Sequence, residues 1–310
     1  MISIAMATYN GEKYLAEQID SILVQSYSDF ELIISDDCST DSTRIILKKY
    51  EEKDSRIKLH FNETNLGFKK NFEQTLRFCS GEFIAFADQD DVWFKNHLEI
   101  LIGNIGAADL IGGNALLTDS YLNPSDISMK DITGIKTENS NPNFLFLHEL
   151  YSNIFQGTAC LFRSKLLKVL LPIPECVLFH DYWAALIAGI CNGLRYTTEP
   201  LLLYRKHEKQ ITKSQKQTIF MGIKQSLKNR EINIANKKHH MQILEALVIR
   251  TCDTKKKEQI LDVIEYNKNL LNGKKIPALK HFVRNYSIIY GESSFIFYLL
   301  RAIKILLGIL

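Results

Sequence analysis

The stretch that decides the fold of this chain is residues 82–91, Glu-Phe-Ile-Ala-Phe-Ala-Asp-Gln-Asp-Asp. Its first six residues are mostly apolar and rich in aromatic and branched side chains, which predicts a short buried strand. Asp88, Asp90 and Asp91 place three carboxylates where that strand ends. Such carboxylates repel one another unless a cation neutralises them, and an Asp-x-Asp pair suits a hard divalent ion that carries a phosphorylated ligand. The alternative is a solvated acidic turn, which Asp-x-Asp alone does not exclude.

Strand and helix patterns alternate before this stretch. Strands are expected at residues 2–7, 32–34 and 57–61, and helices at 13–25, 42–53 and 69–79. Repeated βα units predict an α/β fold, a Rossmann-like and mostly parallel sheet flanked by helices. Polar residues end three of the strands, so they are expected to meet at one edge of the sheet, where ligands of open α/β sheets bind. The sequence has no Gly-x-Gly-x-x-Gly and no Gly-Lys-Ser/Thr loop, so neither the dinucleotide nor the P-loop type of phosphate site is expected.

The rest of the chain is less regular. Residues 120–142 are polar and rich in Asn and Ser, which predicts a surface loop that could act as a lid. The elements expected after it are a helix near 143–152, a strand at 158–162, a helix from about 181, strands near 194–198 and 201–205, and helices beyond 213.

Charge divides the chain into two parts, although the net charge of the whole is only +3. Residues 1–212 carry 20 Lys and Arg against 28 Asp and Glu, a net charge of −8, whereas residues 213–310 carry 18 against 7, a net charge of +11. The basic part is suited to nucleic acid or to an anionic membrane surface. The six cysteines show neither Cys-x-x-Cys nor zinc-ligand spacing, so reduced thiols are expected. The first residues show a strand in place of a secretion signal, which predicts a cytoplasmic protein.

Six short motifs occur in order along residues 1–212. They are Ala7-Thr8-Tyr9-Asn10-Gly11, Ser35-Asp36-Asp37-Cys38-Ser39-Thr40-Asp41, Asn65-Leu66-Gly67, Asp88-Gln89-Asp90-Asp91-Val92-Trp93, His180-Asp181-Tyr182-Trp183 and Tyr204-Arg205-Lys206-His207. On these motifs the chain resembles the family 2 glycosyltransferases, whose catalytic domain has the GT-A fold. It looks nearest to the bacterial rhamnosyltransferase-like branch that builds surface polysaccharides such as capsule and cell wall.

The resemblance implies that the first motifs hold a nucleoside-diphosphate sugar. The residues that it places at the donor nucleotide are Thr8, Tyr9, Asn10, Glu12, Asp37, Lys70 and Asp88. Tyr9 is expected to stack on the base. Asp37 is expected to accept a hydrogen bond from a pyrimidine N–H, because a ring without that donor would leave the carboxylate buried and unpaired. The alternatives are a helix cap for Asp37 and an exposed helix lysine for Lys70.

The resemblance also implies a metal site. Asp90 is expected to be the direct ligand, with Asp88 near the ribose and His207 completing the metal or diphosphate site. The ion would neutralise the charge that grows as the nucleoside diphosphate leaves. Oxygen ligands favour Mg²⁺ or Mn²⁺, and an imidazole ligand shifts the preference to Mn²⁺. The alternative for His207 is an ordinary surface histidine.

Asp181 is expected to be the catalytic base of an inverting transfer, which needs a proton acceptor within reach of the acceptor hydroxyl. The alternative is an N-cap. The diphosphate and acceptor side is expected to include Arg205, Gln156, Gly157, His180 and Trp183. Gly157 would permit close approach by a sugar, and Trp183 would either pack or shape the acceptor pocket. Cys38 stands where the family usually has Gly, and little cost is expected in a turn that tolerates small residues.

Residues 213–310 carry no family signature and are expected to form a basic helical region. Residues 295–310 are the most hydrophobic stretch but are shorter than the about 20 residues that span a bilayer. Arg301 and Lys304 share a helical face, which favours a helix lying on the inner face of the cytoplasmic membrane, where lipid-linked saccharide acceptors are found. The alternative is a tail packed on the catalytic domain or a partner subunit, and a homo-oligomer is left open.

The leading prediction is therefore a metal-dependent inverting glycosyltransferase that extends a lipid-linked glycan. The first choice of donor is dTDP-rhamnose, and the alternative is a UDP-hexose or UDP-N-acetylhexosamine. A nucleic-acid-binding protein is the second hypothesis; it is disfavoured because the basic part lacks interleaved aromatic residues and a helix-turn-helix signal. A nucleotidyltransferase would need a Gly- and Lys/Arg-rich phosphate loop after the first strand, which residues 8–12 are not.

Overall fold

The computed structural model describes residues 1–135, 141–207, 230–286 and 302–306. The chain divides into two compact units. The first comprises Met1–Phe146, Asn153–Ile173 and Val177–Glu208, and the second comprises Leu147–Ser152, Pro174–Cys176 and Lys209–Leu310. Sequence analysis placed its division at residue 212 and assigned both short segments of the second unit to the catalytic domain.

The first unit begins with the expected βα repeats. The strands are β1 (Ile2–Thr8), β2 (Phe30–Asp36), β3 (Ile57–Phe61) and β4 (Phe83–Ala87), and the helices are α1 (Leu15–Leu23), α2 (Thr43–Glu51) and α3 (Phe68–Phe78). All pairings among these four strands are parallel. Leu15, Ile19 and Ile22 of α1 are fully buried, as their spacing predicts. On α2, Thr43 and Leu47 form the buried face, and Ile45 is 59% exposed.

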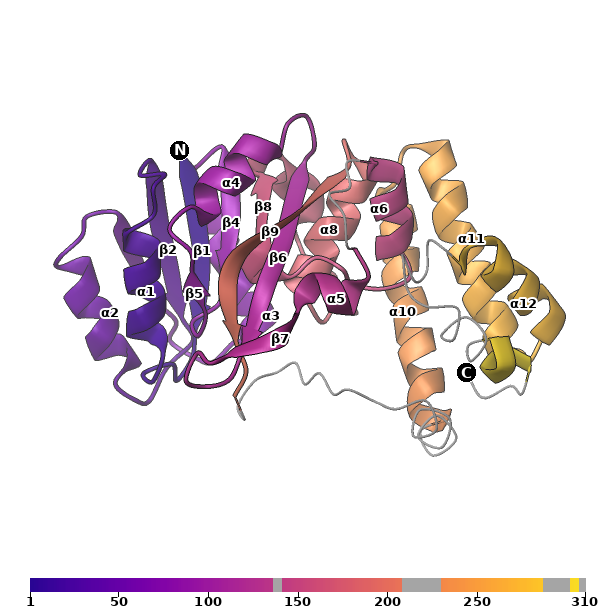
Figure 1. Ribbon diagram of the computed structural model, residues 1–310, viewed down its shortest axis with the longest axis horizontal. Helices are drawn as coiled ribbons and strands as arrows, with labels where there is room; N and C mark the ends of the chain where they lie inside the picture. The colour runs from indigo at the N-terminus through magenta and orange to yellow at the C-terminus, as the bar shows by residue number, and fades with distance from the viewer. Residues whose placement is uncertain (136–140, 208–229, 287–301, 307–310) are drawn as a thin grey trace. The chain divides into compact units, whose positions relative to one another are not determined.

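The second half of this unit adds an antiparallel strand to the sheet. Its elements are β5 (Val92–Trp93), α4 (His97–Asn104), β6 (Leu110–Thr118), β7 (Pro124–Ser128), α5 (Met129–Thr133), α6 (Pro142–Glu149), the 3₁₀ helices Gly157–Ala159 and Ser164–Leu166, β8 (Cys160–Arg163), α7 (Leu167–Leu170), α8 (His180–Ile190) and β9 (Leu194–Arg205). Strand β8 lies antiparallel between β4 and β6, and β9 pairs parallel with β6. The sheet is therefore mixed, with the order β3-β2-β1-β4-β8-β6-β9-β5 and with β7 beside β6 (Figure 1).

Two local expectations need correction. The expected loop at 120–142 contains strand β7 and helix α5, whose start is closed by reciprocal bonds between Ser128 and Asp131; residues 136–140 lie outside the described part. The two strands expected near 194–198 and 201–205 are one strand, β9, whose register shifts beside Gly113 and Asn114 of β6.

The described part of the second unit is helical. Its helices are α10 (Arg230–Arg250), α11 (Thr254–Leu271) and α12 (Lys275–Arg284), and residues 302–306 are also helical. Ile305 is 2% exposed and packs in a cluster with Tyr266, Ala278 and Phe282. Within the described part of the predicted tail, this packing favours the alternative of a tail that packs on protein. None of the described helices is both long enough and apolar enough to cross a bilayer.

Candidate active site

The carboxyl ends of the parallel strands meet at one edge of the sheet. Strands β1 and β2 end together, with Thr8 opposite Asp36, and Ala87 at the end of β4 lies opposite Met6. Strand β6 is antiparallel to β8, which is antiparallel to β4, so β6 and its parallel neighbour β9 end at the same edge. The loops that follow these strands carry nearly all of the predicted donor and metal residues.

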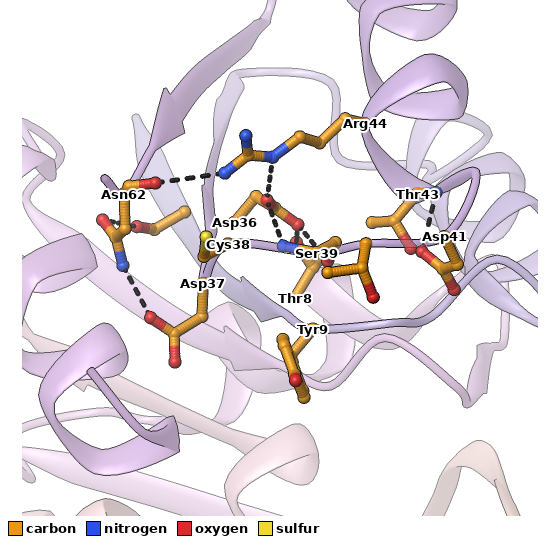
Figure 2. Close-up of polar contacts among 12 residues, drawn as sticks. Thr8, Tyr9, Asp36, Asp37, Cys38, Ser39, Asp41, Thr43, Arg44 and Asn62 are labelled. Atoms are coloured by element: carbon orange, nitrogen blue, oxygen red, sulfur yellow. Dashed lines mark hydrogen bonds and ion pairs between the residues drawn. The ribbon is translucent and has the colours of Figure 1, made fainter. Parts of the chain in front are cut away.

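Asp36 organises the turn after β2 (Figure 2). Its buried carboxylate accepts hydrogen bonds from the backbone N–H of Ser39 at 3.0 Å, from Nε of Arg44 at 2.6 Å and from the Thr8 hydroxyl at 3.2 Å. Asp36 therefore holds the turn and the Arg44 side chain, whereas the backbone N–H of Thr43 at the start of α2 donates to Asp41 Oδ1 at 3.0 Å. Thr8 is 1% exposed and bonds to Asp36, so the structure favours a supporting role for it over contact with the nucleotide.

Asp37 shapes the next loop. Its Oδ1 accepts from the backbone N–H of Leu66 at 2.7 Å and from Nδ2 of Asn62 at 3.0 Å, and its Oδ2 accepts from the N–H of Gly67 at 2.8 Å. A carboxylate has about four acceptor positions, so three bonds leave Asp37 one further acceptor position. This arrangement is compatible with the pyrimidine contact expected of Asp37.

Asn10 and Glu12 join the loop after β1 to the loop after β2. The backbone N–H of Thr40 donates to Asn10 Oδ1 at 2.9 Å, and that of Asn10 donates to the Ser39 hydroxyl at 2.9 Å. The N–H of Ser42 donates to Glu12 Oε2 at 2.9 Å. Both predicted donor residues therefore hold two of the three strand-end loops together.

Gln89 fixes the third loop, a role that sequence analysis missed. Its amide accepts from the backbone N–H of Tyr9 at 2.9 Å and donates to the carbonyl of Tyr9 at 3.1 Å. A Cβ atom at Gly11 would lie 2.3 Å from Gln89 Oε1, so a larger residue there would displace the Gln89 amide. The Tyr9 ring is 48% exposed, which leaves it accessible for stacking. A lone glutamine gives no sequence signal, but Gly11 opposite it is a hint of close approach.

The buried carboxyl groups that follow β4 have raised pKa values. Burial, and then the charges of Asp90 and Asp181, raise the pKa of Asp88 to about 8. Burial, followed by Asp90 and Asp88, also raises the pKa of the fully buried Asp91, whose Oδ1 accepts the backbone N–H of Arg205 at 3.1 Å. Four carboxyl groups gathered in this way repel one another, which a bound cation would relieve.

Asp90 and His207 form a pair, as the metal prediction requires. Asp90 Oδ2 lies 2.8 Å from His207 Nε2, and both side chains are mostly buried. The described residues contain no group of three or more His, Cys, Asp or Glu side chains arranged around a metal position. The pair nevertheless fits a divalent ion, since carboxylate and imidazole are donors that Mn²⁺ accepts, and donor phosphates would supply further oxygen ligands.

Arg205 differs from its expected role. Its side chain is 3% exposed; Nε donates to the Asp90 carbonyl at 2.8 Å, Nη1 donates to the Ser120 carbonyl at 2.9 Å, and Nη2 contacts Glu17. The guanidinium also lies 4.4 Å from the centre of the Tyr14 ring. The guanidinium is buried among protein groups. The structure therefore favours a role for Arg205 in holding the loop that contains Asp90, in place of the expected contact with the diphosphate.

Asp181 lies in the first turn of α8, one position inside the start of the helix, so it is not the N-cap; that position belongs to Phe179. Its Oδ2 accepts the N–H of Gly157 at 3.0 Å and its Oδ1 accepts the N–H of Tyr182 at 2.7 Å. Burial raises its pKa above the ordinary value, although these N–H donors act in the opposite direction. A Cβ at Gly157 would lie 3.2 Å from the Asp181 Cβ, so the glycine gives room to Asp181 in addition to any sugar.

Two of the residues expected on the acceptor side pack in the interior. Trp183 is fully buried and donates its indole N–H to the Leu170 carbonyl at 3.0 Å, which selects packing from the two roles foreseen. His180 stacks on Phe72 at 3.7 Å between ring centres and meets Phe86 edge-on at 4.5 Å. Burial lowers the pKa of His180 to about 3, so its ring is neutral.

The last two predicted residues are Gln156 and Lys70. Gln156 precedes the 3₁₀ helix at Gly157, and its buried Oε1 has no hydrogen-bond partner among the described residues. Lys70 is exposed in the first turn of α3.

A sequence profile of glycosyl transferase family 2 matches residues 3–170, more than half of the chain. The chain belongs to glycosyl transferase family 2. The matched residues include the strand-end loops after β1, β2 and β4 and the glycine that contacts Asp181. This membership establishes an enzyme class, a glycosyltransferase.

The chain is similar to WfgD of Escherichia coli, which is named a UDP-Glc:alpha-D-GlcNAc-diphosphoundecaprenol beta-1,3-glucosyltransferase. The two are 44% identical over 102 residues, and this match covers 33% of this chain and 40% of WfgD. The chain is also 40% identical over 99 residues to TuaG of Bacillus subtilis, which is named a putative teichuronic acid biosynthesis glycosyltransferase. This match covers 32% of this chain and 39% of TuaG. The chain thus matches about two fifths of the length of these relatives. Neither WfgD nor TuaG is named a rhamnosyltransferase, so the rhamnosyltransferase-like branch stays a prediction.

Two solved structures share the fold of this chain. The structure of S. aureus TarS residues 1–349 in complex with UDP-GlcNAc superposes with a TM-score of 0.59 at 22% identity, covering 93% of this chain and 89% of that TarS fragment. The mannosyltransferase PcManGT from Pyrobaculum calidifontis, in complex with GDP-Man and Mn²⁺, superposes with a TM-score of 0.58 at 17% identity, covering 100% of this chain and 80% of PcManGT. These likenesses establish the GT-A-like fold predicted from the sequence.

Proposed function

We propose that this chain transfers a sugar, with inversion and with the aid of a divalent metal ion, from a nucleoside-diphosphate donor to a lipid-linked saccharide acceptor in cell-surface polysaccharide synthesis. The observation that carries this proposal is the grouping of the Asp90–His207 pair, Asp88 and Asp181 at the edge where the donor loops meet. A transferase of this kind needs a cation at the diphosphate and a base at the acceptor, and the grouping supplies candidates for both.

The nucleotide is proposed to lie along the loops after β1 and β2. Tyr9 stacks on the base with its exposed ring, and Asp37 accepts the ring N–H with its remaining acceptor position. Uracil and thymine both carry that N–H, so this contact suits UDP-sugars and dTDP-rhamnose equally. The names of WfgD and of the TarS complex support a UDP-sugar. We therefore place UDP-sugars beside dTDP-rhamnose as candidate donors.

The chemistry is a single displacement. Asp181 removes the proton of the acceptor hydroxyl while that oxygen bonds to the anomeric carbon of the donor, and the bond from this carbon to the diphosphate breaks. The raised pKa of Asp181 suits it to this task, because a base works best with a pKa near the working pH. Asp90 and His207 would hold Mn²⁺ or Mg²⁺, which supplies charge neutralisation at the leaving diphosphate when bound.

The acceptor and the location of the enzyme are linked in this proposal. The name of WfgD includes a diphosphoundecaprenol acceptor, which supports a lipid-linked acceptor for this chain as well. Such an acceptor would bring the enzyme to the inner face of the cytoplasmic membrane as a peripheral protein. The basic C-terminal part, with its net charge of +11 over residues 213–310, is suited to that surface.

A donor panel tests the proposal. Hydrolysis and binding of UDP-glucose, UDP-GlcNAc, dTDP-rhamnose and GDP-mannose are measured with Mn²⁺, with Mg²⁺ and with a chelator. We expect selective, metal-dependent engagement of one uridine or thymidine donor. Indifference to every donor with either metal would overturn the proposal, and engagement of GDP-mannose alone would overturn the role of Asp37.

A further inference from the structure

Helix α12 of the second unit has two faces of different character. Its inner face, which includes Ala278, His281 and Phe282, is buried. Ala278 and Phe282 pack in the cluster that contains Tyr266 of α11 and Ile305. This packing fixes which side of α12 faces outward.

The outer face carries branched apolar side chains. Ile276 is 68% exposed and Val283 is 50% exposed. They lie seven residues apart, and the exposed Lys280 lies between them, four residues after Ile276. Residues at this spacing share one face of a helix. The face therefore carries two exposed apolar side chains two turns apart with a lysine on the turn between them.

Basic residues surround this face. Lys274 and Lys275 are exposed at the start of α12, and Arg284 is exposed at its end, where it pairs with Asp262 of α11 at 2.6 Å. Lysines at a helix N-terminus are unfavourable, because the backbone dipole is positive there, and the first turn of α12 holds no acidic residue. Helix stability therefore does not explain these two lysines, whereas an anionic partner would.

The combination selects one class of partner. Protein interfaces are depleted in lysine, whereas helices that lie on membranes combine lysines with aliphatic side chains that enter the interfacial region. We propose that the outer face of α12 docks on an anionic lipid bilayer, with Ile276 and Val283 entering the interface and Lys274, Lys275 and Lys280 meeting lipid phosphates. This inference deepens the proposed function, because it names the surface that would bring the enzyme to a lipid-linked acceptor.

Vesicle binding by the full chain tests the inference. The protein is sedimented with vesicles of phosphatidylcholine containing 30% phosphatidylglycerol and, separately, with vesicles of pure phosphatidylcholine. We expect binding to the anionic vesicles that falls with added salt, and at least about tenfold weaker partitioning of the double variant Ile276→Glu/Val283→Glu. The matched control is Ile45→Glu, since Ile45 is 59% exposed on helix α2 in the acidic part of the chain; it should bind as the wild type does.

Several outcomes would overturn the inference. They are equal binding to neutral vesicles, undiminished binding of the double variant, and a dimer in light scattering that the double variant abolishes, which would assign the face to a second copy of the chain. Circular dichroism checks that α12 still folds in the variant. Donor hydrolysis by the same variants is measured in parallel, so a chain that hydrolyses donor but ignores vesicles refutes the docking face and leaves the proposed function standing.

Discussion

Asp181 and Gly157 show how single residues set the chemistry of this site. The Gly157 N–H donates to the Asp181 carboxylate at 3.0 Å, and the missing side chain of Gly157 lets that carboxylate approach. The position of the proposed base therefore depends on a glycine 24 residues earlier in the chain. Correct placement of a base is worth large factors in rate, so small displacements matter.

We predict that Gly157→Ala lowers the transfer rate about tenfold or more while donor affinity stays within about twofold, because the new methyl group displaces Asp181 by a few tenths of an ångström. Steady-state kinetics and calorimetric donor binding measure the two effects. Gly103→Ala is the control, since nothing lies within 4 Å of a Cβ at Gly103. An unchanged rate in Gly157→Ala would refute the dependence of the Asp181 position on Gly157.

Cys38 contradicts the expectation that replacing the usual glycine costs little. Its φ of 64° lies in the left-handed region, which costs a residue with a side chain about 1–2 kcal/mol. We predict that Cys38→Gly raises the free energy of unfolding by about 1 kcal/mol, measured by denaturant titration.

The reverse substitution provides the control for Cys38. Gly273 has a φ of 68° and open space around its Cβ position, so Gly273→Ala should lower stability by a similar amount through conformation alone. A loss of stability in Cys38→Gly would show that contacts of the thiol outweigh the backbone cost.

At the scale of elements, the site is three loops joined by side chains. Asn10 and Glu12 connect the loops after β1 and β2, and Gln89 connects the loop after β4 to Tyr9. The loops are thus fixed to one another by hydrogen bonds in the absence of ligand. Such preorganisation reduces the entropy that donor binding must overcome.

The contact between Gly11 and Gln89 allows a double-mutant test of this linkage. We predict that Gly11→Ala weakens donor binding about tenfold, because the added methyl group would meet the Gln89 amide at 2.3 Å. Adding Gln89→Ala should restore part of that loss, since it removes the clash. Calorimetric titration with UDP and Mn²⁺ measures both. Strictly additive losses in the double variant would refute the proposed linkage of the two loops.

The sequence predicted the first four strands and their polar ends, because alternating βα patterns and strand-end motifs are local signals. Asp37, Asp90 and His207 follow strands that end at one edge of the sheet, and their roles there stay predictions. Sequence analysis assigned no element to residues 92–119, and it predicted the strand at 158–162 but not the antiparallel pairing of β8, since pairing direction depends on the path of the chain between strands. Thr8 and Arg205 also acquire their partners, Asp36, Ser120 and Glu17, only through the fold.

At the scale of the whole molecule, buried neutral histidines couple stability to pH. Burial lowers the pKa of His97 and His180 in the first unit to about 3 and that of His240 in the second unit to about 4. An unfolded chain protonates its histidines near pH 6.5, so below that pH the unfolded state binds protons that the folded state does not. Stability is therefore full above about pH 6.5 and falls as the pH drops towards 3.

We predict that each of these histidines costs about 2 kcal/mol of folding stability at pH 5 relative to pH 8. His180→Phe should remove its share, because phenylalanine suits the space between Phe72 and Phe86 and does not titrate. Urea unfolding of both proteins at pH 5 and pH 8 gives the difference. An equal loss in both would show that His180 is protonated in the folded state.

The measurement that tests the central claim most directly compares Asp181→Asn with the wild type in sugar transfer and in UDP binding with Mn²⁺. The claim is that Asp181 acts as the base while separate residues hold the donor. It predicts a fall in transfer of about 10²–10⁴-fold, the contribution of a positioned base, with UDP affinity within about twofold of the wild type. Transfer at the wild-type rate, or a loss of UDP affinity as large as the loss of transfer, would contradict it.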